Sequence, residues 1–173
     1  VWELIFANIR FDIVRHDMQA EIGAATIGER RLLELLGKYG LEHFTAHKEA
    51  LFEATRRMME AEIAGIPNGS YSGEGYVYYD GRHEGTKFTI RVDIEVSERK
   101  IRFDYSRTDR QTNGFVNGTF TSSASATILT LLQMINPDIP HNEGMVEPIE
   151  IVIPEGTILN ASYPKATTFG NHL

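Results

Sequence analysis

The sequence predicts an α+β fold, with an N-terminal helical hairpin packed with a mainly antiparallel sheet and one further buried helix. Apolar residues recur at helical spacing up to about residue 66, and beyond it they alternate with polar residues at a period of two. Helices that are segregated from an antiparallel sheet are typical of α+β proteins. Residues 1–173 are therefore expected to be a single unit, helical over 1–66 and mostly β over 67–173.

Two long helices are expected in the helical part. The first starts at Asp17, a residue type that commonly caps helix N-termini, and it ends at Gly40, where a left-handed C-terminal cap belongs. The second covers about residues 42–64, because a Gly-Ile-Pro breaker follows at 65–67. We expect these two helices to form the hairpin.

Alternation of apolar and polar residues predicts the sheet. The stretch "TKFTIRVDIEV" (86–96) is a strand with one apolar and one polar face, and a turn at "SERK" (97–100) joins it to a partner at 101–105. An earlier strand is expected within "YSGEGYVYYDG" (71–81), and a later one around 149–153.

The stretch "SSASATILTLLQMI" (122–135) predicts a helix that stops at Asn136-Pro137. Its small residues, such as Ala124, Ser125 and Ala126, allow close approach to a neighbouring backbone. We therefore expect this helix to be buried.

Composition excludes several classes of protein. The chain contains no cysteine, which removes disulfide frameworks and thiolate chemistry and fits a cytoplasmic location. Its formal net charge of −7 disfavours nucleic-acid binding. No apolar run approaches the ~18 residues of a membrane span, so no membrane role is expected. The chain begins without methionine and ends on a loop-like segment, and we expect it to be an internal fragment of a longer polypeptide.

Two pairs of residues in the helical part are candidates for chemistry. His16 and Asp17 stand at the expected helix start, where helix capping is the simpler interpretation and a catalytic role is the alternative. His43 and His47 are four residues apart and could face one metal ion, but nothing nearby completes a third ligand, so a surface role is favoured. We predict no metal site in this chain.

Polar residues gather in the stretch "IRFDYSRTDRQTNGFVNGTFTS" (101–122). Asp104 and Arg107 are candidate catalytic residues, and Asn113, Asn117 and the later Asn142 are candidate substrate-binding residues. The two Asn-Gly pairs are also strong turn signals, so the stretch is either a structured loop, the wall of a site, or both. The sequence lacks a P-loop and the common nucleophile and dinucleotide motifs.

Five segments are spread in order along essentially the whole chain: "ANIRFDIVRHDMQAEIGA", "RLLELLGKYG", "GIPNGSYSGEGYVYYDG", "IRFDYSRTDRQTNGFVN" and "IPHNEGMVEPIEIVIPEGTILNASYPKATTFGN". Together they resemble the hydantoinase B family, which includes N-methylhydantoinase B, 5-oxoprolinase and the large subunits of acetone and acetophenone carboxylases. The run "RTDRQTNGFVNGTF" and the ending "PKATTFGNHL" are most similar to the acetone carboxylase branch. Arg107 stands where other members tend to have glycine, and its guanidinium would suit a bicarbonate-derived anion.

The resemblance implies part of an ATP-dependent ketone carboxylase of the type that converts acetone and bicarbonate to acetoacetate. The alternatives are an ATP-dependent hydrolase of cyclic amides, such as a hydantoinase or 5-oxoprolinase, and a structural segment at a subunit interface. It also implies a hetero-oligomer with a hydantoinase A-type ATP-binding subunit and, in some members, a small third subunit. The full complex would use ATP and a divalent metal such as Mn²⁺, whose ligands lie upstream of the matched segment. We therefore expect this chain to hold no cofactor and to be inactive alone.

Overall fold

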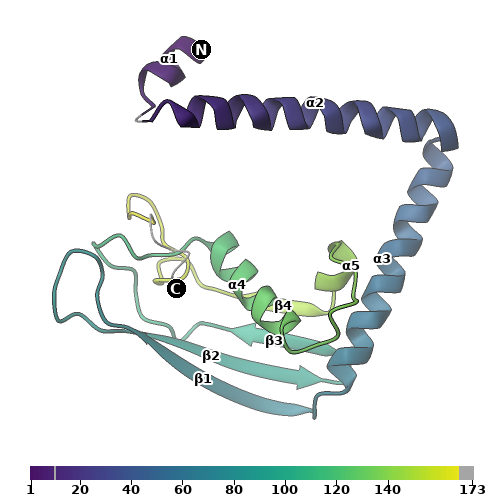
Figure 1. Ribbon diagram of the computed structural model, residues 1–173. Helices are drawn as coiled ribbons and strands as arrows, with labels where there is room; N and C mark the ends of the chain where they lie inside the picture. The colour runs from purple at the N-terminus through teal and green to yellow at the C-terminus, as the bar shows by residue number, and fades with distance from the viewer. Residues whose placement is uncertain (10, 168–173) are drawn as a thin grey trace. The chain divides into compact units, whose positions relative to one another are not determined.

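The computed structural model describes residues 1–9 and 11–167 (Figure 1). These residues divide between two compact units, whose boundary lies between Ala50 and Leu51. The elements in chain order are α1 (Trp2–Ala7), α2 (Ile13–Tyr39), α3 (Leu41–Ala64), β1 (Gly69–Val77), β2 (Phe88–Ser97), β3 (Lys100–Asp104), α4 (Phe120–Leu132), α5 (Glu143–Val146) and β4 (Ile149–Val152). The prediction of an α+β fold is confirmed. No helix in the described part of the chain is long and apolar enough to cross a membrane.

The first unit is helical, and its long helix α2 begins earlier than expected. The prediction that Asp17 caps this helix is wrong, because α2 starts at Ile13, with Asp12 at the N-cap position. Asp12 and Asp17 are equally good capping residues by type, and the residues between them are all compatible with one further helical turn. The predicted end is confirmed, since Gly40 has φ 77° and its N–H donates to the carbonyl of Leu36. The pairing of the two long helices stays a prediction.

The second unit is built on a four-stranded mixed sheet in the order β1-β2-β3-β4. The first three strands are antiparallel neighbours, as predicted, and β4 adds to β3 in parallel. One row across the sheet consists of Tyr71, Ile94, Phe103 and Ile151, which are paired from strand to strand. Because side chains alternate between faces along a strand, every second residue from this row belongs to the same apolar face.

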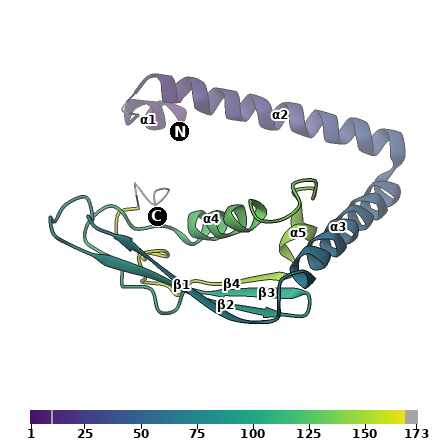
Figure 2. The ribbon, with the colours of Figure 1, turned by 60° about the horizontal axis from the view of Figure 1, so that its bottom comes forward.

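The apolar face of the sheet carries the core of the second unit. Helices α4 and α5 lie on one side of the sheet, as two views show (Figures 1 and 2). From α3, Met59 and Ile63 are fully buried and join the cluster that also contains Val96 and Phe103. The opposite face of β2 carries Arg91, Asp93 and Glu95, so the predicted division into an apolar and a polar face is confirmed.

Helix α4 buries one side only. Thr119 and Ser122 form a reciprocal capping box at its start, in which the Thr119 hydroxyl accepts from the Ser122 N–H. Ser123, Thr127 and Leu131 are the buried residues of this helix. Ser125 and Ala126 are exposed, so the small residues that led us to expect burial are divided between the two sides of the helix.

Candidate functional site

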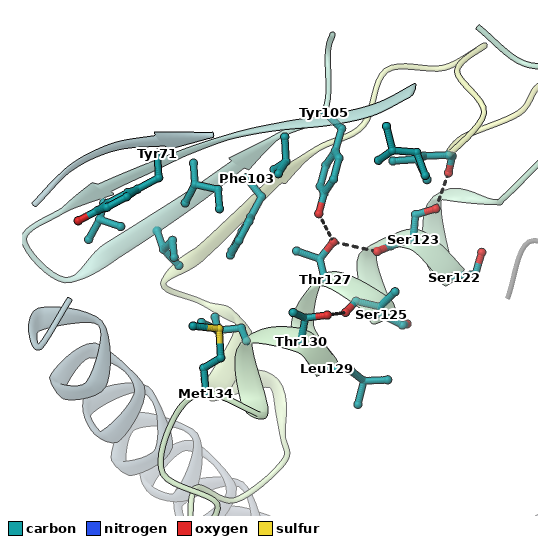
Figure 3. Close-up of a pocket in the computed structure, with 18 of the residues that line it drawn as sticks. Tyr71, Phe103, Tyr105, Ser122, Ser123, Ser125, Thr127, Leu129, Thr130 and Met134 are labelled. Carbon is teal, nitrogen blue, oxygen red and sulfur yellow. Dashed lines mark hydrogen bonds between the residues drawn. The ribbon is translucent and has the colours of Figure 1, made fainter. Parts of the chain in front are cut away.

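The second unit contains an apolar groove between the sheet and α4 (Figure 3), with a volume of about 790 Å³. Tyr71, Phe103 and Tyr105 reach into it from the sheet, and Ser122, Thr130 and Leu129 line it from α4. Its floor is the apolar side of β2, which contributes Ile90, Val92, Ile94 and Val96. A cavity of this size and apolar lining is suited to apolar groups of a ligand or of another protein segment.

The groove is open because strand β1 contributes few side chains to its floor. Gly69, Gly73 and Gly75 pair with Val96, Val92 and Ile90, so these glycines belong to the same face of the sheet as the apolar residues of β2. A glycine on that face has no side chain, so it leaves its paired residue on β2 uncovered. At these three positions β1 therefore provides no side chain to cover the apolar residues of β2.

A chain of hydrogen bonds crosses the inner end of the groove. The Tyr105 hydroxyl lies 2.8 Å from Thr127 Oγ1, and Thr127 Oγ1 donates to the carbonyl of Ser123 (Figure 3). The Ser123 hydroxyl donates to the carbonyl of Leu159 at 2.7 Å. Burial raises the pKa of Tyr105, which keeps its phenol protonated. These hydroxyls tie α4 to the sheet and to the loop beyond β4.

A second feature is a polar cluster around Asp80, which is only 1% exposed. One carboxylate oxygen accepts from the backbone N–H groups of Arg82 and His83, at 2.9 and 2.6 Å. The other accepts from His83 Nδ1 at 2.8 Å and from the Thr112 hydroxyl at 2.6 Å. A single buried side chain thus joins the loop after β1 to the loop after β3.

The hydrogen bonds determine the charge of Asp80. Burial by itself raises the pKa of this carboxyl group. The bonds from His83 and Thr112 and those from the two backbone N–H groups outweigh burial, so the pKa lies far below its ordinary value. Asp80 is therefore a buried carboxylate anion at neutral pH.

Asn117 and Asn113 belong to the same loop cluster but differ in their surroundings. Asn117 is fully buried: its Oδ1 accepts from the Thr112 N–H, and its Nδ2 donates to the carbonyls of Thr112, Gly114 and Ala166. Asn113 is exposed and accepts a hydrogen bond from Lys165 Nζ. Asn117 thus holds the loop, whereas Asn113 faces a small depression at the surface.

Asp104 and Arg107 lie at the end of β3. Arg107 makes a two-pronged ion pair with Asp93 on β2, with Nε 2.6 Å from one carboxylate oxygen. Hydrogen bonds from Ser106 and the nearby Arg102 guanidinium hold the pKa of Asp104 below its ordinary value. Neither Asp104 nor Arg107 lines the apolar groove, which this stretch borders through Phe103, Tyr105 and Ser122.

The remaining candidates lie elsewhere. Asn142 caps α5, where its Oδ1 accepts from the Gly144 N–H, and its Nδ2 donates to Thr55 on α3. His16 and Asp17 are exposed on α2 in the first unit. In residues 1–9 and 11–167 no three His, Asp or Glu side chains gather closely enough to hold a metal ion.

Asp80 is the site residue that the sequence pattern did not single out. The dipeptide Asp80-Gly81 is typical of a turn after a strand, and an aspartate that starts a turn commonly accepts from backbone N–H groups two and three residues later. Its contact with Thr112, 32 residues away, carries no local signal.

The fold belongs to the α+β class, because helices pack on the apolar face of a mixed sheet. A family model described as hydantoinase B/oxoprolinase matches residues 1–173. The chain therefore belongs to the hydantoinase B/oxoprolinase family.

Individual relatives agree with this assignment. The chain is 33% identical to a protein of Pseudomonas sp. (strain NS671) that is named as the B component of a D-/L-hydantoinase, over 96% of this chain and 30% of the relative. It is 32% identical to 5-oxoprolinase of Dictyostelium discoideum, over 91% of this chain and 13% of that protein. It thus spans less than a third of the length of these relatives.

Two solved structures share the fold. The ATP-dependent caprolactamase from Pseudomonas jessenii matches with a TM-score of 0.86 and 27% identity, over 98% of this chain and 29% of that one. A nucleotide-free structure of acetone carboxylase matches with a TM-score of 0.70 and 19% identity, over 81% of this chain and 20% of that one. The second match is a likeness of fold alone.

Proposed function

We propose that this chain is part of a subunit of an ATP-dependent enzyme that opens a cyclic amide. The observation that carries the proposal is the match of its backbone, over 98% of the chain, to the ATP-dependent caprolactamase. The relatives named above are called after hydantoin and 5-oxoproline, which are also cyclic amides. A common chemistry thus joins these relatives of the chain.

Ketone carboxylation is the second candidate function. It is supported by the shared fold with acetone carboxylase and by the resemblance of the run "RTDRQTNGFVNGTF". The ion pair between Arg107 and Asp93 favours the opening of a cyclic amide over carboxylation, because this guanidinium already binds a carboxylate through two of its nitrogens. To bind a bicarbonate-derived anion, Arg107 would first have to leave Asp93.

The cofactors and partners belong to the same proposal. Relatives whose names mark them as one component of a hydantoinase and one component of a caprolactamase support an assembly with other subunits. We propose a hydantoinase A-type partner that binds ATP and phosphorylates the substrate, with a small third subunit in the carboxylase alternative. A divalent metal such as Mn²⁺ would be held by residues outside the described part of this chain, which offers no fitting ligand set.

Product analysis separates the two reactions. The complete complex is incubated with ATP and hydantoin, 5-oxoproline or caprolactam, and separately with acetone and labelled bicarbonate. We expect a ring-opened acid from a cyclic amide, formed in proportion to ATP consumption. Labelled acetoacetate, without turnover of any cyclic amide, would establish the carboxylase instead.

A third interpretation is that this segment is scaffold or subunit interface. It can be tested one residue at a time. Because Asn117 and Asn142 make their hydrogen bonds to loops and helices of this chain, we expect Asn117→Ala and Asn142→Ala to reduce thermal stability and the yield of assembled complex. Turnover per assembled complex should be retained. Asn113→Ala is the matched control for stability, since Asn113 is exposed. Loss of turnover in a fully assembled Asn117→Ala complex would show a site role.

A further inference from the structure

A small depression beside the Asp80 cluster brings together cationic side chains from two distant loops. It has a volume of about 400 Å³ and is lined by Arg82, His83, Asn113, Pro164, Lys165 and Ala166. Asn117 Nδ2 donates to the carbonyl of Ala166 at 2.9 Å, which joins the loop of Asn113 to the Ala166 side of the depression. The Thr112 hydroxyl donates to Asp80 at 2.6 Å, which joins the same loop to the segment of Arg82 and His83. Two buried side chains, Asn117 and Asp80, thus hold together the segments that line the depression.

The imidazole of His83 is held in place by Asp80. Its Nδ1 lies 2.8 Å from the Asp80 carboxylate, and the His83 backbone N–H donates to the same side chain. With Nδ1 engaged, Nε2 is on the opposite edge of the ring, and the ring is about half exposed. A buried carboxylate that fixes one nitrogen of a histidine orients the other nitrogen for a ligand.

The charge of the depression differs from that of the whole protein. The chain carries a formal net charge of −7, yet this depression contains an arginine, a lysine and a histidine. Within residues 1–9 and 11–167, no carboxylate forms an ion pair with Arg82 or Lys165, and the Asp80 carboxylate pairs with His83. Lys165 Nζ instead donates to the amide oxygen of Asn113, which leaves its positive charge without a counter-ion there. Guanidinium and ammonium groups in such positions are suited to oxyanions.

We propose that this depression binds a small oxyanion, a carboxylate or a phosphate group, between Arg82, His83 and Lys165. Arg82 and Lys165 supply charge and N–H donors, and His83 in its imidazolium form supplies a further donor through Nε2. Asp80 is a positioning residue, which acts through His83. The proposed site rests on the residues that line the depression and not on the proposed function.

The test is a labelling experiment on the full-length subunit. Diethyl pyrocarbonate acylates accessible imidazoles, and mass spectrometry of peptides gives the rate at His83 and, as an internal reference, at the exposed His141. The probes are inorganic phosphate and acetate, each compared with chloride at the same ionic strength. We expect phosphate to protect His83 saturably and to leave the rate at His141 unchanged.

Variants show whether the protection comes from this depression. Arg82→Gln and Lys165→Gln should each raise the half-protecting phosphate concentration about tenfold, which corresponds to about 1.4 kcal/mol of binding free energy. Lys100→Gln is the matched control, because Lys100 is an exposed cation that pairs with Ser97 at the far end of β2. Circular dichroism checks that all three variants are folded.

Each outcome of the labelling experiment either supports the oxyanion site or overturns it. Protection by phosphate alone assigns a phosphate group, and protection by acetate as well assigns carboxylates to the same site. Protection that does not saturate, or that is equal in Arg82→Gln, Lys165→Gln and Lys100→Gln, would mean an adventitious ion only and would overturn the proposal. Absence of any protection of His83 would overturn it too.

Discussion

Replacing Asp80 with asparagine is expected to lower the free energy of unfolding by about 2–4 kcal/mol at neutral pH, since hydrogen bonds to a buried charged group contribute roughly 1.5–3 kcal/mol each and an amide retains only part of them. The variant keeps the shape of the side chain but removes the negative charge that four donors surround. Urea unfolding followed by circular dichroism measures the difference. Asp138→Asn is the matched control, because Asp138 is exposed.

The effect of Asp80→Asn should depend on pH. The pKa of Asp80 is lowered in the folded protein, so its contribution to stability is fully present above the unfolded value of about 4. The contribution is lost as the pH falls toward the folded-state value, and the difference between wild type and variant should therefore shrink below about pH 4. Faster amide exchange at Arg82 and His83 in the variant would locate the change. A difference in stability that is constant from about pH 7 to about pH 3 would contradict this account.

Replacing Gly144 with alanine is the second change for which we expect a large effect. A Cβ at this position would lie 2.0 Å from the carbonyl oxygen of Phe52 and 2.7 Å from its carbonyl carbon. Both atoms belong to the backbone of α3, which cannot move aside as a flexible side chain can. Overpacking of this kind costs typically about 1–3 kcal/mol, and we expect a loss at the upper end of that range.

The control for Gly144→Ala is the same substitution at Gly28. This glycine lies inside α2, and a Cβ there would meet nothing within 4 Å apart from its chain neighbours and the backbone of its own helix. Alanine is favoured over glycine inside a helix by up to about 1 kcal/mol, so Gly28→Ala should be neutral or stabilising. Thermal unfolding of both variants gives the comparison. Equal melting temperatures for the two would show that α5 does not pack against α3 as described.

The sequence predicted the fold best where the signal is local. Alternation from Phe88 to Val96 identified β2 and its two faces, and Gly40 marked the end of α2. The start of α2 was misplaced because Asp12 and Asp17 carry the same capping signal. The parallel pairing of β3 with β4 could not be predicted, since it joins residues 48 positions apart, such as Ile101 and Ile149.

For the polar residues, too, contacts between residues far apart in sequence could not be predicted. Asn113 and Asn117 occur in identical Asn-Gly pairs, yet one is exposed and the other is fully buried with hydrogen bonds to three carbonyls. What distinguishes them is contact with Ala166 and Lys165, which come from a later loop. A one-dimensional pattern identifies the turn, and only the folded chain decides which side chain faces inward.

The glycines of β1 make the width of the apolar groove adjustable by single substitutions. At Gly75 a Cβ would meet no other atom within 4 Å, and at Gly73 it would make ordinary contact with Val92 at 3.7 Å. Larger residues at these two positions would narrow the groove from one side while α4 and the aliphatic residues of β2 stay unaltered. Replacing these glycines in turn with alanine, valine and leucine would therefore measure how wide a group the groove accommodates in the complete protein.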